Sequence, residues 1–90
     1  MTTTTLTFIS DPGHGWLEVP MQMVRDLGIA HKISGYSYVD KSKAMAYLEE
    51  DCDADVFMRA AAIAGIELTT KHSECRGDAF VRRLPRFEGA

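Results

Sequence analysis

The sequence has few cysteines and no long apolar stretch, which argues against a disulfide-rich protein and against a membrane-spanning helix. Its 90 residues include only 2 cysteines and 3 prolines, and no stretch approaches the roughly 20 apolar residues that a membrane-spanning helix needs. The N-terminus, MTTTTLTFIS, has neither the basic region nor the long apolar stretch of a secretory signal. We therefore expect a protein that stays in the cytoplasm.

The cysteines do not indicate a metal site. Cys52 and Cys75 form no Cys-x-x-Cys motif, and His72 with Cys75 supplies at most half of a zinc site. We expect no metal and no other cofactor. A disulfide needs the fold to bring Cys52 and Cys75 together, and a reducing cytoplasm disfavours it, so we expect two thiols.

Charge is unevenly distributed along the chain. The formal net charge is -3. Residues 40–55 hold six acids against two lysines, whereas residues 71–90 hold five bases against three acids. A domain that binds polyanions is usually basic overall, so the global balance weighs against nucleic acid as the main partner. This balance does not exclude a local basic strip that binds nucleic acid.

Hydrophobic periodicity and turn residues predict a regular succession of elements. Strands are expected at 6–9, 16–19, 33–39, 44–48, 67–72 and 79–84. Helices are expected from Pro20 to Gly28 and from Asp51 or Asp53 to Gly65, with a glycine cap at each C-terminal end. Asp51 or Asp53 would accept the free N–H groups of the second helix.

This order, ββαββαββ, is typical of an α+β domain. The 46% of hydrophobic residues suit one small core. We predict one domain over residues 1–90, with residues 1–4 and 86–90 as flexible ends. The helices should cover one face of an antiparallel sheet. Because such a sheet has free edges, a dimer is an open alternative.

The stretch SDPGHGW places His14 between two glycines next to the only tryptophan. A histidine there could transfer protons near neutral pH, but only Ser10 and Asp11 lie nearby as partners. We expect a hairpin turn in which Gly13 and Gly15 take positive φ.

The stretch EEDCDAD is the strongest local signal of the chain. Its five carboxylates belong to Glu49, Glu50, Asp51, Asp53 and Asp55. Acids stabilise a helix N-terminus, yet five exceed what a helix start needs. The surplus could bind a basic surface of another protein.

Arginines and aromatics suggest a second kind of surface. Arg82, Arg83 and Arg86 could grip phosphate or an acidic partner, or simply be solvated. Five aromatics could stack on bases, although we expect core packing for them in so small a domain. They are Phe8, Trp16, Tyr36, Tyr38 and Tyr47.

Three segments together resemble a family of small proteins encoded by bacteriophages and related mobile elements, a family without an established activity. The segments are DPGHGWLEVP (11–20), KISGYSY (32–38) and YLEEDCD (47–53). The resemblance covers about residues 8–66. It implies an accessory gene expressed in a bacterial cytoplasm, and it supplies no catalytic residues.

Three functional hypotheses follow. The leading one is a non-enzymatic protein that binds a basic protein surface through the five carboxylates, as an inhibitor of a host or defence complex comparable to anti-CRISPR proteins. The alternative is a nucleic-acid-binding accessory protein that uses the C-terminal arginines, including Arg76, with Tyr36 and Tyr38. A small enzyme built on His14 is the third.

Overall fold

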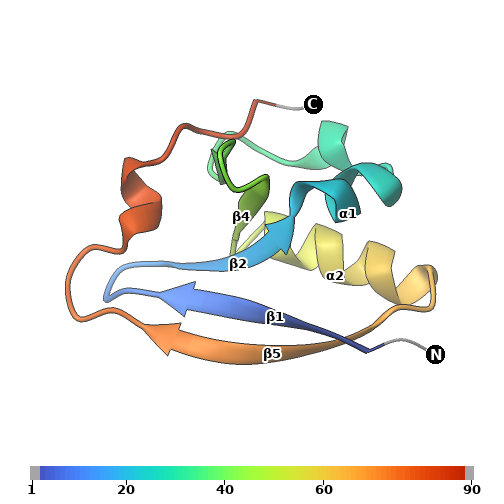
Figure 1. Cartoon of the computed structure of the whole chain (residues 1–90), viewed down its shortest axis with the longest axis horizontal. Coiled ribbons are helices and arrows are strands. Elements are labelled where there is room, and N and C mark those ends of the chain that lie inside the picture. Colours follow the sequence, from blue (N-terminus) through green and yellow to red (C-terminus); the bar gives the residue numbers. More distant parts are fainter. Residues whose placement is uncertain (1–2, 89–90) are drawn as a thin grey trace.

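A five-stranded sheet in the order β3-β4-β2-β1-β5 forms the centre of this computed structural model, which describes residues 3–88 (Figure 1). The strands are β1 (Thr3–Ser10), β2 (Gly15–Pro20), β3 (Tyr38–Asp40), β4 (Met45–Glu49) and β5 (Glu67–Glu74). The helices are α1 (Met21–Asp26) and α2 (Asp53–Ile63), with 3₁₀ turns η1 (Ala30–Lys32) and η2 (Phe80–Arg83). The expected α+β class is confirmed.

The strand pairing is antiparallel except at one edge. β1 pairs with β2, β2 with β4 and β4 with β3, all antiparallel, whereas β5 lies parallel to β1. β4 and β5 therefore run in the same direction. Parallel strands need a crossover connection, and α2 is that connection. The sequence had indicated antiparallel pairing throughout, which is wrong for β5.

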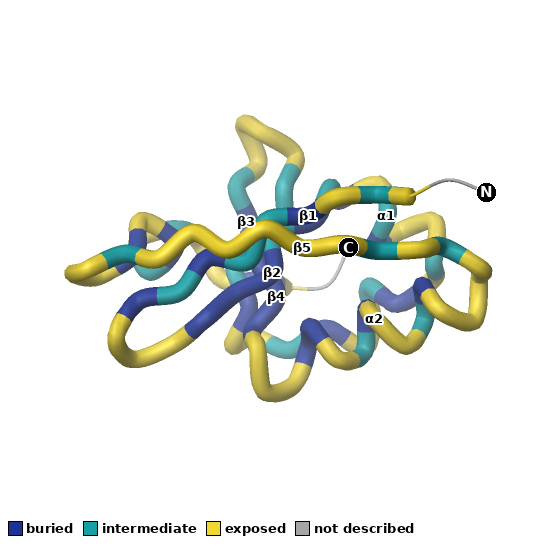
Figure 2. The backbone as a smooth tube through the Cα atoms, turned by 90° about the horizontal axis from the view of Figure 1, so that it is seen from below, coloured by how far each residue is buried: buried dark blue, intermediate teal, exposed yellow. Residues whose placement is uncertain are grey.

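One face of the sheet packs against both helices. Successive side chains of a strand point to opposite faces, so Leu17 and Val19 of β2 share one face. They belong to one buried cluster with Val24 of α1 and Phe57 of α2. The prediction that both helices cover one face is confirmed. Figure 2 shows the consequence for the strands, because β2 and β4 are mostly buried while β5 is mostly exposed.

The opposite face is covered by residues 79–87, here called the C-terminal strap. Ala79 and Val81 of the strap pack on Ile9, Trp16 and Tyr47. Figure 1 shows this segment passing above the sheet, from the end of β5 toward β3. A chain that crosses over a face has no neighbouring strand to pair with, so the strand expected at 79–84 is instead the 3₁₀ turn η2.

The end of the strap pairs with the outer edge of β3. The Val39 N–H donates to the Pro85 oxygen at 2.9 Å, and the Phe87 N–H donates to the Ser37 oxygen at 2.8 Å. Phe87 is 3% exposed and joins the helix-side cluster. The strap thus wraps around the sheet edge from one face to the other.

Flexible ends were expected at 1–4 and 86–90. This is wrong for residues 3–4, which pair with β5, and for residues 86–87, which lie beside β3. Residues 1–2 and 89–90 lie outside the described part of the chain.

The glycines correctly predict where the two helices end, whereas the alternation at 33–39 predicts a strand that is too long. Gly28 and Gly65 have φ of 68° and 79°, as left-handed helix caps require. The strand expected at 33–39 is reduced to β3, because residues 34–37 form a turn. Within residues 3–88 no helix is long and apolar enough to cross a membrane.

Phe87→Ala should lower the free energy of unfolding by about 3–5 kcal/mol, because it empties a core site and removes the anchor of the strap. Urea unfolding followed by circular dichroism measures this. The control is Ile63→Ala, at a side chain that is 89% exposed, for which we expect a change within about 0.5 kcal/mol. Equal losses for both variants would contradict this account of the strap.

Candidate functional site

The Asp11 carboxylate organises the turn between β1 and β2. Its Oδ1 accepts hydrogen bonds from the N–H groups of Gly13 at 3.0 Å and His14 at 2.9 Å. Its Oδ2 accepts from the N–H of Ala79 at 3.0 Å. The positive φ expected at Gly13 and Gly15 is not found, because the aspartate closes the turn with its side chain.

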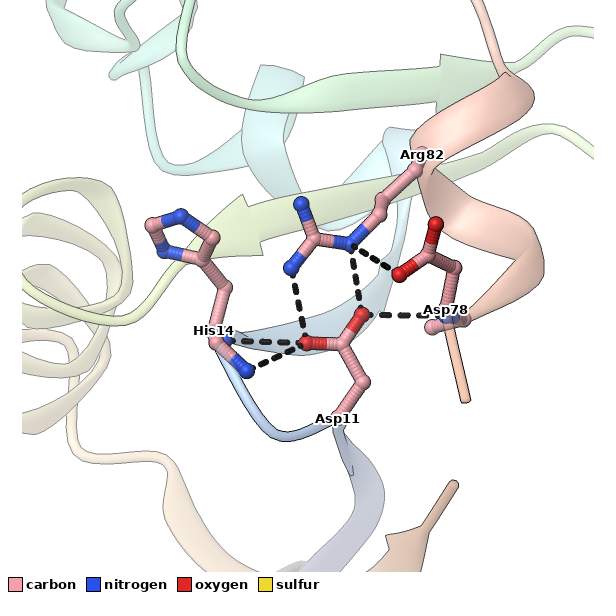
Figure 3. A network of polar contacts seen from close by, with 6 residues as sticks. Asp11, His14, Asp78 and Arg82 are labelled. Carbon is pink, nitrogen blue, oxygen red and sulfur yellow. Dashed lines mark hydrogen bonds and ion pairs between the residues drawn. The ribbon is translucent and has the colours of Figure 1, made fainter. Parts of the chain in front are cut away.

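Arg82 of the strap forms a two-pronged ion pair with Asp11 (Figure 3). Its Nε lies 2.6 Å from Oδ2 and its Nη2 lies 2.8 Å from Oδ1. The Asp11 side chain is fully buried. The Arg82 guanidinium, and after it the Ala79 N–H, hold the pKa of Asp11 far below its usual range. The pair ties the hairpin turn to a strap residue 71 positions away.

A pocket of about 410 Å³ opens beside this ion pair, and we call it the tyrosine pocket. It collects side chains from the hairpin turn, the turn before β3, the start of α2 and the strap. The lining residues are His14, Trp16, Tyr36, Tyr38, Glu49, Asp51, Cys52, Arg82 and Arg86.

Two adjacent aromatic rings of the tyrosine pocket each carry a guanidinium group. Arg82 lies 5.5 Å from the centre of the Trp16 ring, and Arg86 lies 5.9 Å from that of Tyr38. The Trp16 and Tyr38 rings meet edge to face at 6.2 Å. Tyr36 is 68% exposed. The pocket therefore offers an open aromatic surface beside fixed cations.

The structure unites residues that the sequence had suggested separately. His14, Tyr36, Tyr38, Arg82 and Arg86 all line the tyrosine pocket. Arg83 is exposed on the strap and does not line it.

Two features of the site do not follow from the sequence: the ion pair of Asp11 with Arg82, and the place of Trp16 in the lining of the pocket. The sequence indicates Asp11 as a turn residue and as a partner for His14, and it gives no hint that Arg82 binds this carboxylate. Trp16 was expected to be a core residue, and it is buried with one side toward the pocket.

The acidic stretch does not form one continuous binding surface. Asp53 is 2% exposed, and its Oδ2 accepts hydrogen bonds from the Ser34 N–H and from the hydroxyls of Ser34 and Ser37. The buried Glu49 accepts from the N–H groups of Asp51 and Cys52, each at 3.1 Å. The prediction that Asp51 or Asp53 caps α2 is wrong, because Asp53 turns toward the 34–37 turn.

Three acids of this stretch stay at the surface. Glu50, Asp51 and Asp55 are exposed, and Asp55 pairs with Arg59 one helical turn later at 2.9 Å. A partner could therefore meet these three side chains but not Asp53. Their role in binding stays a prediction.

The surroundings of His14 support its interpretation as a turn residue. Its ring lies 6.1 Å from that of Trp16, and within residues 3–88 no side chain hydrogen bonds to its imidazole.

The cysteines are both free, Cys52 exposed and Cys75 partly buried. Desolvation, followed by the charges of Glu49, Asp53 and Asp51, raises the pKa of the Cys52 thiol. The thiolate is thus disfavoured at neutral pH. In the described part of the chain no three histidine, cysteine or acidic side chains gather where they could hold a metal ion.

Comparison with known proteins gives no relative: no family model, no curated protein and no solved structure matches this chain. The function must therefore be argued from the site itself.

Asp11→Asn should destabilise the protein at neutral pH and change the pH dependence of its stability. A carboxyl group with a depressed pKa contributes stability above its unfolded pKa of about 4, and this contribution is lost as the pH falls toward the folded value. Between about pH 5 and pH 2 the wild type should lose more stability than the variant. Urea midpoints at several pH values measure this, and parallel curves would contradict the role given to Asp11.

Proposed function

We propose that this protein binds single-stranded nucleic acid without altering it chemically, and that a base stacks in the tyrosine pocket. The observation that carries the proposal is the convergence of Tyr36, Tyr38, Arg82 and Arg86 on one open pocket. The proposed setting is a bacterial cytoplasm, with the chain as an accessory protein of a phage or mobile element.

The chemistry of the tyrosine pocket suits a base. Every base has a π-face, so stacking on exposed Tyr36 needs no particular sequence. Arg86, already placed over the Tyr38 ring, can neutralise a phosphate next to the stacked base.

The surface of the strap extends this pocket with positive charge. Arg83 and Arg86 are exposed there, and Lys43 of the β3–β4 turn lies 5.8 Å from the centre of the Phe80 ring of η2. Cations thus follow the strap over its length. This local strip supports phosphate binding in a chain whose net charge is negative.

Tyr36→Ala should weaken binding of a single-stranded DNA 10-mer by about 5- to 150-fold, because stacking contributes about 1–3 kcal/mol per base. Fluorescence anisotropy at 50 and 200 mM salt measures the affinity, which should fall with salt. Tyr36→Phe keeps the ring and should bind like wild type. Absent binding at low salt, or full binding by Tyr36→Ala, would refute the proposal.

A second candidate function is the binding of a protein with a basic surface, as an inhibitor of a host or defence complex. The observation that favours it is the exposure of Glu50, Asp51 and Asp55 around the start of α2. This candidate gives no role to the tyrosines.

Combined charge reversal, E50K with D51K and D55K, separates the two functions. If a protein partner meets these acids, tagged wild type should retain it from a bacterial extract containing nucleic-acid-based defence complexes, and the triple variant should not. Charge reversal of two exposed acids of β5, Glu67 and Glu74, is the control. Without such a partner, the triple variant should simply bind single-stranded DNA more tightly, because negative charge near the tyrosine pocket has been removed.

A further inference from the structure

A second cavity, of about 320 Å³, lies against the end of the strap, and we call it the cationic pocket. Three cationic side chains line it: Arg25 of α1, Lys41 of the β3–β4 turn and Arg86 of the strap. Glu88 is the one acid among its lining residues. These four side chains give the pocket a formal charge of two positive units.

The floor of the cationic pocket is buried and apolar. Met21, Val39 and Phe87 line it and are all buried in the helix-side cluster. The Met21 N–H donates to the Ala44 oxygen at 2.9 Å, which joins α1 to the β3–β4 turn. The backbone segments that carry Arg25 and Lys41 are therefore joined beside the pocket.

The three cations form no ion pair within the described residues. Among residues 3–88, no carboxylate lies within 4.0 Å of Arg25, Lys41 or Arg86, whereas Arg59 and Arg82 both have acidic partners. The acid next to Lys41, Asp40, accepts hydrogen bonds within its own turn from Ser42. The positive charge is thus available to a ligand.

Arg86 is held in place without being neutralised. Its Nη1 donates to the Gly35 oxygen at 2.9 Å, and its guanidinium lies over the Tyr38 ring. These contacts leave other N–H groups of the guanidinium to reach an anion, since arginine carries five donors. Arg86 lines both the cationic pocket and the tyrosine pocket.

We propose that the cationic pocket binds a phosphate monoester. Such a group carries about −1.5 to −2 charges at pH 7, which matches the charge of the lining side chains, whereas an internal phosphodiester carries one. The pocket is large enough for the phosphate and part of the attached sugar, which would lie against the apolar floor.

The source of this phosphate is the end of a bound strand, an assignment that rests on the proposed function. Because Arg86 belongs to both pockets, a strand with one base stacked in the tyrosine pocket can place its terminal phosphate in the cationic pocket. A free nucleotide offers the same chemical group, so the experiment must tell these sources apart.

The test compares three DNA 10-mers by calorimetry: one without a terminal phosphate, one with a 5′-phosphate and one with a 3′-phosphate. Thymidine 5′-monophosphate and thymidine serve as free probes. We expect one terminal phosphate to tighten binding about tenfold, as charge-assisted hydrogen bonds would. R25Q and K41Q should each reduce this preference to about twofold and leave the unphosphorylated 10-mer nearly unaffected.

The control is K71Q on β5, which removes the same charge far from the cationic pocket in the sheet order. It should keep the full preference, since a general effect of charge would act equally in all three variants. Circular dichroism checks that each variant is folded.

The outcomes separate this inference from the proposed function. Equal binding of all three 10-mers, or a preference that survives in R25Q and K41Q, overturns the phosphate site and leaves strand binding intact. If no 10-mer binds but the monophosphate binds more tightly than thymidine and R25Q abolishes the difference, the site stands and strand binding fails. If neither the 10-mers nor the monophosphate bind, both are refuted.

Discussion

The ion pair between Asp11 and Arg82 is the interaction on which the arrangement of the site depends. A buried carboxylate is tolerated only when its oxygens are fully hydrogen-bonded, and Asp11 accepts from the N–H groups of Gly13, His14 and Ala79 and twice from Arg82. Its donors come from both the hairpin turn and the strap. One side chain therefore fixes the turn, the strap and the position of Arg82 over Trp16.

The topology explains why a pocket exists on that face. The crossover from β4 to β5 contains α2 and the connection from β2 to β3 contains α1, and both helices pack on the opposite face, whereas the short strap covers Trp16 and Tyr47. A strap is narrower than a helix layer and cannot cover every aromatic ring. Tyr38 is therefore half-buried, and Tyr36 reaches solvent. In this fold an aromatic recess follows from the one-sided placement of the helices.

The sequence correctly predicts those features of the fold that residues close together in the chain determine. Both hairpins and the glycine caps at Gly28 and Gly65 depend on turn chemistry within a few residues, and all are present. The strap was mistaken for a strand because alternating Ala79 and Val81 fit a strand locally. These residues cross over the sheet instead because the Ala79 N–H binds the distant Asp11 and because Ala79 and Val81 pack on the side chains of the sheet face.

The site shows the same division between local and distant information. Each member of the tyrosine pocket stood out in its own segment, yet nothing local indicated that the segments meet. The acidic stretch shows the converse, since its residues are adjacent in sequence but make contacts with different segments. Asp53 serves the 34–37 turn and Glu49 the start of α2, a partition decided by contacts that the stretch itself does not contain.

The net charge of the chain does not describe the potential at the site, for a related physical reason. At physiological salt, interactions between exposed charges fade over about 8 Å, whereas the molecule is 37 Å long. An anion that approaches the strap therefore responds to the side chains around it and hardly to acids at the far end. Asp11 is neutralised by Arg82, while Arg25, Lys41 and Arg86 have no acidic partner among residues 3–88. The sign of the electrostatic potential at the site depends on which charged side chains the fold brings together as ion pairs. The net charge, which is summed over the whole sequence, does not contain that information.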